Sequence, residues 1–302
     1  MRLGVAATPE VAIPTLNWLL ESEHELALII TQPDKPAGRG RNLRQSPVAD
    51  WADQHKVAIV KPEATEDLKV HLFNIDCVVT IGYGVLLPQS VLDIPQFGFL
   101  NLHFSLLPAY RGAAPVQRAL QNGDSISGVS VFQLEKGMDT GPIYSTIAVH
   151  IEPQWRSTEL LSVLSKLGPK AVEKALQMIE RGESPSPQMG DSTIAPKISK
   201  LEAQIDFRKD STTIVNHIRA FTYEPGAWCL WKGEPFKITA AISNNEIHLE
   251  QGEIVVLDKK VFVGCGNQTA IEILSVIPAG KKEMSSIDWA RGARLQGGEH
   301  FG

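Results

Sequence analysis

The chain has 302 residues, a length typical of two domains that each bury a core of their own. Its 29 basic and 34 acidic residues give a net charge of −5, which excludes a protein that binds nucleic acids over its whole surface. The three cysteines are far apart and lack the spacing of metal ligands, so we expect neither a disulfide framework nor a metal site.

The N-terminal part of the chain alternates between strand and helix patterns. The predicted elements are strands over 3–6, 26–31, 57–60, 76–81 and 99–103, helices over 11–22 and 115–121, and a hairpin over 128–151. This alternation is typical of an α/β domain with a doubly wound, mainly parallel sheet and helices on both faces. The loops after Ala6, Ile81 and His103 are then expected to meet at the carboxyl edge, where such sheets bind ligands.

A further helix is predicted to begin at Ser157. We expect Gly168-Pro169 to interrupt it before helical periodicity resumes at Ala171, because proline lacks the N–H that an interior helical position donates. The N-terminal domain is therefore predicted to span residues 1–182.

The composition changes after residue 182. Residues 183–203 are rich in proline, serine and glycine, which predicts a linker. A helix over 213–220 follows, and then short alternating runs over 227–231, 236–242, 253–257, 261–264 and 270–277. Five short strands with glycine and asparagine turns predict a small antiparallel β-barrel over residues 204–302.

Two polar residues end the predicted strand over 99–103. Alternate residues of a strand face the same way, so Asn101 and His103 are expected to project together while Leu102 points into the core. A carboxamide that stabilises a developing oxyanion, beside an imidazole that moves a proton, suits chemistry at a carbonyl group. The alternative is a strand end with a purely structural histidine.

Asp139 lies between Gly137 and Gly141 in the predicted hairpin. Aspartate is common in turns because its side chain bonds its own backbone, so a structural role is one interpretation. The other is catalytic, because a carboxylate beside an imidazole fixes its tautomer and favours its protonated form.

The segment 33–44 concentrates positive charge in an otherwise acidic protein. It contains Lys35, Arg39, Arg41 and Arg44 against one acid, Asp34. Its prolines and glycines predict an irregular loop that is neither helix nor strand. Such arginines suit phosphate contacts, although a short basic run is also compatible with plain solvated surface.

The chain resembles the formyltetrahydrofolate-dependent transferases and, among these, the methionyl-tRNA formyltransferase family. The resemblance runs nearly end to end, through residues 31–41, 46–48, 101–108, 111–117, 138–141, 218–221, 225–228 and 278–284. The set formed by Asn101, His103, residues 105–108 and Asp139 is shared by all formyl-tetrahydrofolate transferases and hydrolases. The basic loop and the C-terminal motifs are similar to those of the enzymes that act on tRNA.

The resemblance implies a Rossmann-like formyltransferase fold with a C-terminal OB-like barrel that helps to hold tRNA. It implies 10-formyltetrahydrofolate as formyl donor, initiator methionyl-tRNA as acceptor, and catalysis by Asn101, His103 and Asp139 without a metal. It places the donor's pterin against seven residues: Tyr83, Gly84, Leu86, Ser105, Leu106, Leu107 and Pro108. The basic loop is expected to reach the acceptor end of the tRNA.

Three other functions use parts of the same pattern. A transferase acting on a small amine, such as a nucleotide sugar or a ribonucleotide, would keep the catalytic residues but would not need the basic loop. A formyltetrahydrofolate hydrolase would leave the barrel unexplained. A non-catalytic RNA-binding module would have no use for the three catalytic residues.

The first residues enter a strand-like run directly, without the pattern of a signal peptide, and no apolar run is long enough to span a bilayer. We therefore expect a cytoplasmic protein without a membrane partner, and we expect it to act as a monomer.

Overall fold

The computed structural model describes residues 1–37 and 42–302, which form two compact units. Unit 1 comprises Met1–Pro115, Ile126–His150 and Leu161–Ala195. Unit 2 comprises Val116–Ser125, Ile151–Leu160 and Pro196–Gly302. Residues 183–195, which the composition assigns to a linker, therefore cluster with unit 1.

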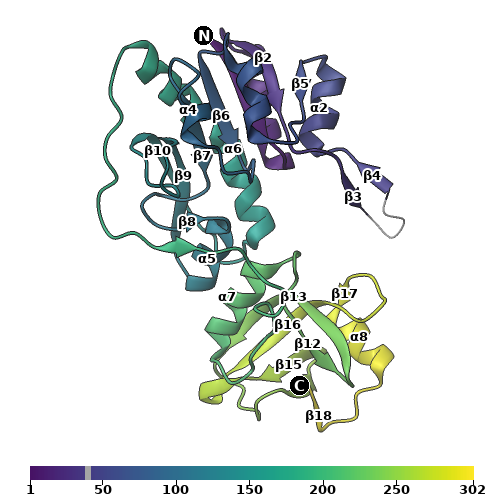
Figure 1. The fold of residues 1–302 in the computed structure, drawn as a ribbon. Coiled ribbons are helices and arrows are strands. Elements are labelled where there is room, and N and C mark those ends of the chain that lie inside the picture. Colours follow the sequence, from purple (N-terminus) through teal and green to yellow (C-terminus); the bar gives the residue numbers. More distant parts are fainter. Residues whose placement is uncertain (38–41) are drawn as a thin grey trace. The chain divides into compact units, whose positions relative to one another are not determined.

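Unit 1 is built on a seven-stranded sheet (Figure 1). The strand order is β10 (Ile143–His150), β9 (Ile126–Gln133), β7 (Phe99–His103), β6 (Cys77–Ile81), β1 (Arg2–Ala7), β2 (Glu25–Ile30) and β5 (Ile59–Val60). The strands from β7 to β5 pair in parallel, and β9 pairs antiparallel with both β7 and β10. The predicted mainly parallel sheet is confirmed, and β1, β6 and β7 end at the same edge.

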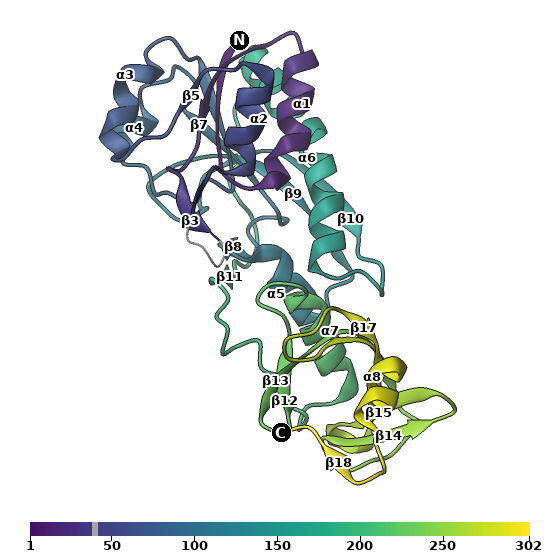
Figure 2. The ribbon, with the colours of Figure 1, turned by 90° about the vertical axis from the view of Figure 1, so that its right-hand side faces the viewer.

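Helices cover both faces of this sheet. They are α1 (Ile13–Glu21), α2 (Pro47–His55), α3 (Lys69–Leu72), α4 (Gln89–Leu92) and α6 (Ser157–Glu180), with the short turns η1 (Glu10–Ala12) and η2 (Thr65–Leu68). Buried residues of α3 and α4 share a core cluster with Val78 and Phe99, whereas Leu102 faces α6 at Gly168. Figure 2 shows α3 and α4 on one side of the sheet and α1 and α6 on the other.

Helix α6 corrects the expected break at Gly168-Pro169, because it continues through Pro169 without interruption. Proline removes one backbone hydrogen bond from the helix. The side chains of Leu164, Val172 and Leu176 on either side of it are fully buried, and this packing outweighs the missing bond. Gly168 is required for another reason, since a Cβ atom there would lie 2.7 Å from Thr15 Oγ1 and 2.8 Å from Leu102 Cδ2.

Unit 2 contains the predicted antiparallel barrel. Its strands follow the order β12 (Trp228–Trp231), β13 (Glu234–Asn244), β16 (Ala270–Ile277), β15 (Lys260–Gly264), β14 (Glu253–Leu257) and β18 (Glu299–His300), with β17 (Met284–Ser285) beside β16. Gly302 exchanges two backbone hydrogen bonds with Leu230, which brings the two ends of the sheet together. The barrel-like architecture expected from the strand pattern is confirmed.

Unit 2 also contains helix α7 (Ser211–Phe221), which packs against β13, and helix α8 (Ser286–Ala293), which packs against β15 and β16. Most of α5 (Pro115–Asn122) belongs to this unit, as does the turn η3 (Gly266–Gln268). Asp210 caps α7, and Ser285 caps α8 by accepting from Asp288 N. Among the helices of residues 1–37 and 42–302, none combines the length and the apolar character needed to cross a bilayer.

The close approach at Gly168 gives a direct test of how α6 supports β7. Gly168→Ala should lower the free energy of unfolding by about 1–3 kcal/mol, because the added methyl overlaps Thr15 and Leu102. Gly292→Ala is the matched control, since a Cβ atom at this position of α8 meets no heavy atom within 4 Å. The control should gain up to about 1 kcal/mol from helix propensity alone. Urea unfolding of both variants measures the difference, and a Gly168→Ala protein as stable as the wild type would contradict the proposed packing.

Candidate active site

Strand β7 carries Asn101 and His103 at the carboxyl edge of the sheet. Asn101 pairs with Thr80 of β6 and with Phe132 of β9, and His103 pairs with Ser130 of β9. Asn101 is half-buried, and His103 is buried with 6% of its surface exposed. In the described part of the chain, no group forms a hydrogen bond with the carboxamide of Asn101, so this side chain is available to a ligand.

The imidazole of His103 is oriented by a backbone carbonyl. Its Nε2 atom lies 2.9 Å from the oxygen of Tyr110. A carbonyl oxygen only accepts, so Nε2 carries the hydrogen and the neutral ring keeps a lone pair on Nδ1. That Nδ1 atom lies 3.8 Å from Oδ2 of Asp139, which is too far for a hydrogen bond but close enough for a strong charge interaction. Nδ1 is therefore the nitrogen that can exchange a proton with a substrate.

Burial lowers the pKa of His103 below its ordinary value of 6.5, because the low-dielectric surroundings disfavour the charged ring. The carboxylate of Asp139 and the hydrogen bond to Tyr110 act in the opposite direction but more weakly. The ring is consequently neutral near pH 7, with Nδ1 as a free base. Asp139 stabilises the cation that forms once Nδ1 takes up a proton.

Asp139 combines the two interpretations that its sequence context allows. Its φ angle of 53° places it in the left-handed region that aspartate tolerates in turns. Its carboxylate, however, accepts a hydrogen bond from the distant N–H of Gly112 at 2.7 Å and is only 14% exposed beside His103. The turn conformation thus presents the carboxylate to the imidazole.

The short strand β8 (Arg111–Gly112) was not predicted from the sequence. It pairs in parallel with β11 (Ile194–Ala195). The carbonyl of Tyr110, just before β8, accepts a hydrogen bond from His103, and the N–H of Gly112, in β8, donates one to Asp139. A Cβ atom on Gly112 would lie 2.6 Å from the oxygen of Ala195, and its φ angle is 125°, so glycine is required. The only signal in the sequence is Gly112 itself, within the 111–117 motif.

The residues expected to contact the pterin after β7 mainly build a turn. Ser105 is 1% exposed, and its hydroxyl donates to the oxygen of Ala109 at 2.6 Å. Leu107 is also buried, and its N–H donates to the hydroxyl of Ser130. Leu106 packs against Gly128, where a Cβ atom would lie 2.5 Å from Leu106 Cδ2. Leu106 and Pro108 are partly exposed, so these two can contact a ligand with their side chains.

The second predicted pterin segment follows β6. Tyr83 is buried in the core cluster with α3 and α4, so only its backbone can face a ligand. Its carbonyl accepts from Gln32 Nε2 at 2.5 Å, and Gly84, with a φ angle of 74°, lies beside the same amide. The side chain of Leu86 is 86% exposed and is free to contact an apolar group.

The basic segment is partly a hairpin, which corrects the expectation of an irregular loop. Strand β3 (Lys35–Ala37) pairs antiparallel with β4 (Asn42–Arg44), and the pair projects from the sheet in Figure 1. Pro36 fits because in a two-stranded ladder its nitrogen can face outward. Of the predicted tRNA-binding residues, Lys35 and Arg44 are exposed, and Arg39 and Arg41 lie outside the described residues.

The positive charges of Lys35 and Arg44 in this hairpin remain available to a ligand. Asp34 forms an ion pair with Lys61, with Nζ and Oδ1 2.6 Å apart. Within residues 1–37 and 42–302, no acid lies within ion-pair distance of Lys35 or Arg44. The Lys35 ammonium donates to Gln32 Oε1, and the amide of Gln32 holds the Tyr83 carbonyl, which links the hairpin to the second predicted pterin segment.

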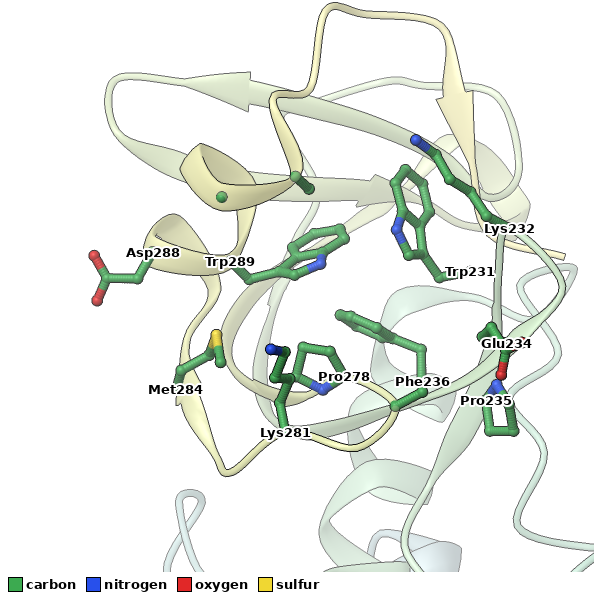
Figure 3. Close-up of a pocket in the computed structure, with 13 residues that line it drawn as sticks. Trp231, Lys232, Glu234, Pro235, Phe236, Pro278, Lys281, Met284, Asp288 and Trp289 are labelled. Carbon is green, nitrogen blue, oxygen red and sulfur yellow. The ribbon is translucent and has the colours of Figure 1, made fainter.

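A cavity of about 520 Å³ in unit 2 contains none of the predicted site residues. Figure 3 shows Trp231, Phe236 and Trp289 around it, with Lys232 and Lys281 at its rim. The rings pack against one another, with the centroids of Trp231 and Trp289 5.3 Å apart, and Lys232 Nζ lies over Trp231. The rings thus form part of the packing of unit 2, and we assign this cavity no catalytic role.

The thiols offer no alternative nucleophile near the sheet. Burial raises the pKa of the Cys77 thiol to about 12, which leaves almost no reactive thiolate near pH 7. Among the described residues, no group of three His, Cys, Asp or Glu side chains is arranged to hold a metal ion.

Comparison with known proteins identifies the family of this chain. Residues 4–176 match the formyl transferase family, and residues 197–294 match the formyl transferase C-terminal domain. A methionyl-tRNA formyltransferase from Thermobifida fusca (strain YX) is 41% identical over 309 residues, which cover 100% of this chain and 99% of the relative. The chain belongs to the methionyl-tRNA formyltransferase family. Its members are one-carbon transferases, and the enzyme class expected from the sequence is confirmed.

Solved structures share the fold of this formyltransferase. A methionyl-tRNA formyltransferase from Clostridium thermocellum matches with a TM-score of 0.58 at 16% identity, over 88% of this chain and 100% of that one. An N-formyltransferase from Helicobacter canadensis, in complex with folinic acid and dTDP-3-aminofucose, matches with a TM-score of 0.68 at 19% identity, over 90% and 98%. At these identities the likeness concerns the fold alone.

The charge interaction between His103 and Asp139 can be measured by NMR titration of the ligand-free formyltransferase. His103 should titrate below 6.5, and Asp139→Asn should lower its pKa further, because the variant removes the charge that stabilises the imidazolium. A His103 pKa that is unchanged or raised in Asp139→Asn would show that the carboxylate does not act on the ring.

Proposed function

We propose that this chain transfers the formyl group of 10-formyltetrahydrofolate to the α-amino group of methionine esterified to initiator tRNA. The observation that carries the proposal is the geometry at the end of β7, where the free carboxamide of Asn101 lies beside the neutral, Asp139-assisted imidazole of His103. The full-length similarity to methionyl-tRNA formyltransferases supports the choice of acceptor.

The chemistry requires a tetrahedral intermediate. The amine nitrogen attacks the formyl carbon, a new C–N bond forms, and the carbonyl oxygen becomes an oxyanion. Asn101 donates hydrogen bonds to this oxyanion from its free carboxamide. Nδ1 of His103 takes the proton released by the amine, and the resulting imidazolium is stabilised by Asp139.

Collapse of the intermediate breaks the bond between the formyl carbon and N10 of the folate. His103 returns its proton to N10, so the products are formylated methionyl-tRNA and tetrahydrofolate with a neutral N10 amine. The nucleophile needs little activation, because an α-amino group titrates near pH ~8 and part of it is already neutral at pH 7. The site therefore acts mainly by positioning and by stabilising charge.

Recognition of tRNA is assigned to the β3–β4 hairpin and to unit 2. Lys35 and Arg44 are exposed, lack ion-pair partners among the described residues, and flank Arg39 and Arg41 in the sequence. In a protein of net charge −5, such a local concentration of positive charge suits the phosphates of an acceptor stem. The barrel of unit 2 matches the formyl transferase C-terminal domain, and we propose that it supplies further tRNA contacts.

A small-amine formyltransferase is the second candidate. The fold of the Helicobacter canadensis N-formyltransferase is similar, and the same three catalytic residues would serve a sugar amine. The basic hairpin distinguishes the two functions, because a small acceptor gives it no phosphate backbone to contact.

One assay separates the candidates. The protein is incubated with 10-formyltetrahydrofolate and, in parallel, with initiator methionyl-tRNA, elongator methionyl-tRNA, an amino sugar nucleotide or water alone. We expect rapid formylation of the initiator tRNA, and turnover should fall about 10²–10³-fold in Asn101→Ala and His103→Ala, because both act on the transition state. The exposed Asn74 and His71 provide control variants, Asn74→Ala and His71→Ala, that should retain full activity. Preferential formylation of the sugar, or release of formate at the same rate without an acceptor, would refute the tRNA assignment.

The hairpin makes a prediction about ionic strength. Replacing Lys35, Arg39, Arg41 and Arg44 by glutamine should weaken tRNA use, because fewer phosphates of the tRNA are neutralised. The slope of log affinity against log salt should become shallower by about 0.7 for each phosphate that the variant no longer binds. Affinity for the folate should stay unchanged.

Lys166→Gln/Lys170→Gln is the control for the hairpin variant, and it removes two positive charges where the hairpin variant removes four. Both lysines are exposed on α6, so the pair removes positive charge from unit 1 away from the hairpin and should leave the salt slope unchanged. A hairpin variant with wild-type tRNA efficiency and salt slope would identify the hairpin as plain solvated surface.

A further inference from the structure

Gln188, in the segment between α6 and β11, uses both ends of its carboxamide. Its Nε2 atom donates to the backbone oxygens of Asp139 and Gly141, at 2.8 Å each. Its Oε1 atom accepts from Nε and Nη2 of Arg111, at 3.1 and 2.7 Å. Carbonyls only accept and a guanidinium only donates, so the orientation of this amide is fixed by its partners.

These contacts close a ring of interactions around Asp139. Gln188 holds its main chain, and the N–H of Gly112 holds its carboxylate at 2.7 Å. Both hydrogen bonds to Asp139 depend on β8, because Arg111 of this strand orients Gln188 and the next residue is Gly112. The strand is in turn anchored to the segment after Gln188, through the hydrogen bond from Arg111 N to Thr193 O at 2.9 Å.

This set of hydrogen bonds matters because the backbone and the carboxylate of Asp139 both have to be held in place. Its φ angle of 53° lies in the left-handed region, which residues other than glycine adopt only when their surroundings hold them there. The carboxylate is aimed at Nδ1 of His103 from 3.8 Å, a distance at which a small rotation of the turn would change the interaction.

We propose that Gln188 is a positioning residue for the formyl transfer: with Arg111 it locks the 137–141 turn, so that the carboxylate of Asp139 stays beside Nδ1 of His103. The carboxamide is specific for this task. Glutamate would accept from Arg111 but present a charged oxygen to the two carbonyls, and asparagine is one methylene too short to span the same partners. The effect on turnover rests on the proposed function, whereas the effect on His103 does not.

The test compares three variants: Gln188→Ala, Gln188→Glu and the matched control Gln133→Ala. Gln133 also bridges two segments of unit 1, because it donates to Phe97 O and accepts from the hydroxyl of Tyr144, both at 3.3 Å. Its carboxamide bonds neither Asp139 nor Gly141. A merely structural role for Gln188 predicts that the alanine variants behave alike.

Two readouts are followed in each protein, the kcat and KM of formylation and the NMR titration of His103 without ligand. Gln188→Ala and Gln188→Glu should lower kcat by up to about 10²-fold, with little change in KM for the folate, because the reacting groups are misplaced but the binding residues are intact. The pKa of His103 should fall in Gln188→Ala, in the direction expected for Asp139→Asn; Gln188→Glu adds a negative charge of its own, so this variant is judged by kcat alone. The double variant Asp139→Asn/Gln188→Ala should lower the pKa of His103 no further than Asp139→Asn alone.

Several outcomes would overturn the proposal. These are a folded Gln188→Ala protein with wild-type kcat and an unchanged His103 titration, an equal loss of kcat in Gln133→Ala, or an additive effect with Asp139→Asn. If the wild-type protein formylates no methionyl-tRNA, the proposed function fails, but the titration still decides whether Gln188 positions Asp139.

Discussion

A buried imidazole has to satisfy its N–H, and the bond that does so sets the chemistry of this site. The Tyr110 carbonyl accepts from Nε2 of His103, which leaves Nδ1 as the basic nitrogen facing Asp139. Two residues further on, Gly112 holds the carboxylate of Asp139. One short stretch of backbone therefore fixes both members of the pair, and burial keeps the ring neutral by lowering its pKa.

The sheet makes this arrangement possible from both sides. Strand β7 lies inside the sheet, between β6 and β9, so its pairing with both neighbours defines where Asn101 and His103 project. On the opposite face, α6 approaches β7 closely at Gly168. Asn101 and His103 thus stand on a strand that is paired on both sides, whereas Asp139 comes from a turn and depends on hydrogen bonds from β8 and Gln188. The pairing of β7 and the hydrogen bonds to Asp139 together maintain the distance between the imidazole and the carboxylate.

Much of this architecture could be predicted from the sequence because its signals are local. The strand and helix patterns gave a mainly parallel sheet and a barrel, and strand alternation placed Asn101 and His103 on one face. Helix α2 was missed although Ser46 and Pro47 form a typical helix start, with Ser46 accepting from Ala49 N. The break expected at Pro169 was wrong because tertiary packing outweighs a single missing hydrogen bond.

The supporting contacts could not be predicted because they join residues that are distant in the sequence. Gln188 lies in a stretch whose composition is typical of a linker, and nothing local indicates that its amide bonds Asp139 and Arg111. The two strands of the basic hairpin likewise pair despite prolines and glycines that favour an irregular loop.

The most direct test of the protonation state assigned to His103 is a measurement of its ¹⁵N chemical shifts in the ligand-free protein near pH 7.5. The structure predicts a neutral ring protonated at Nε2 with Nδ1 unprotonated, and a ring protonated at Nδ1, alone or with Nε2, would contradict it.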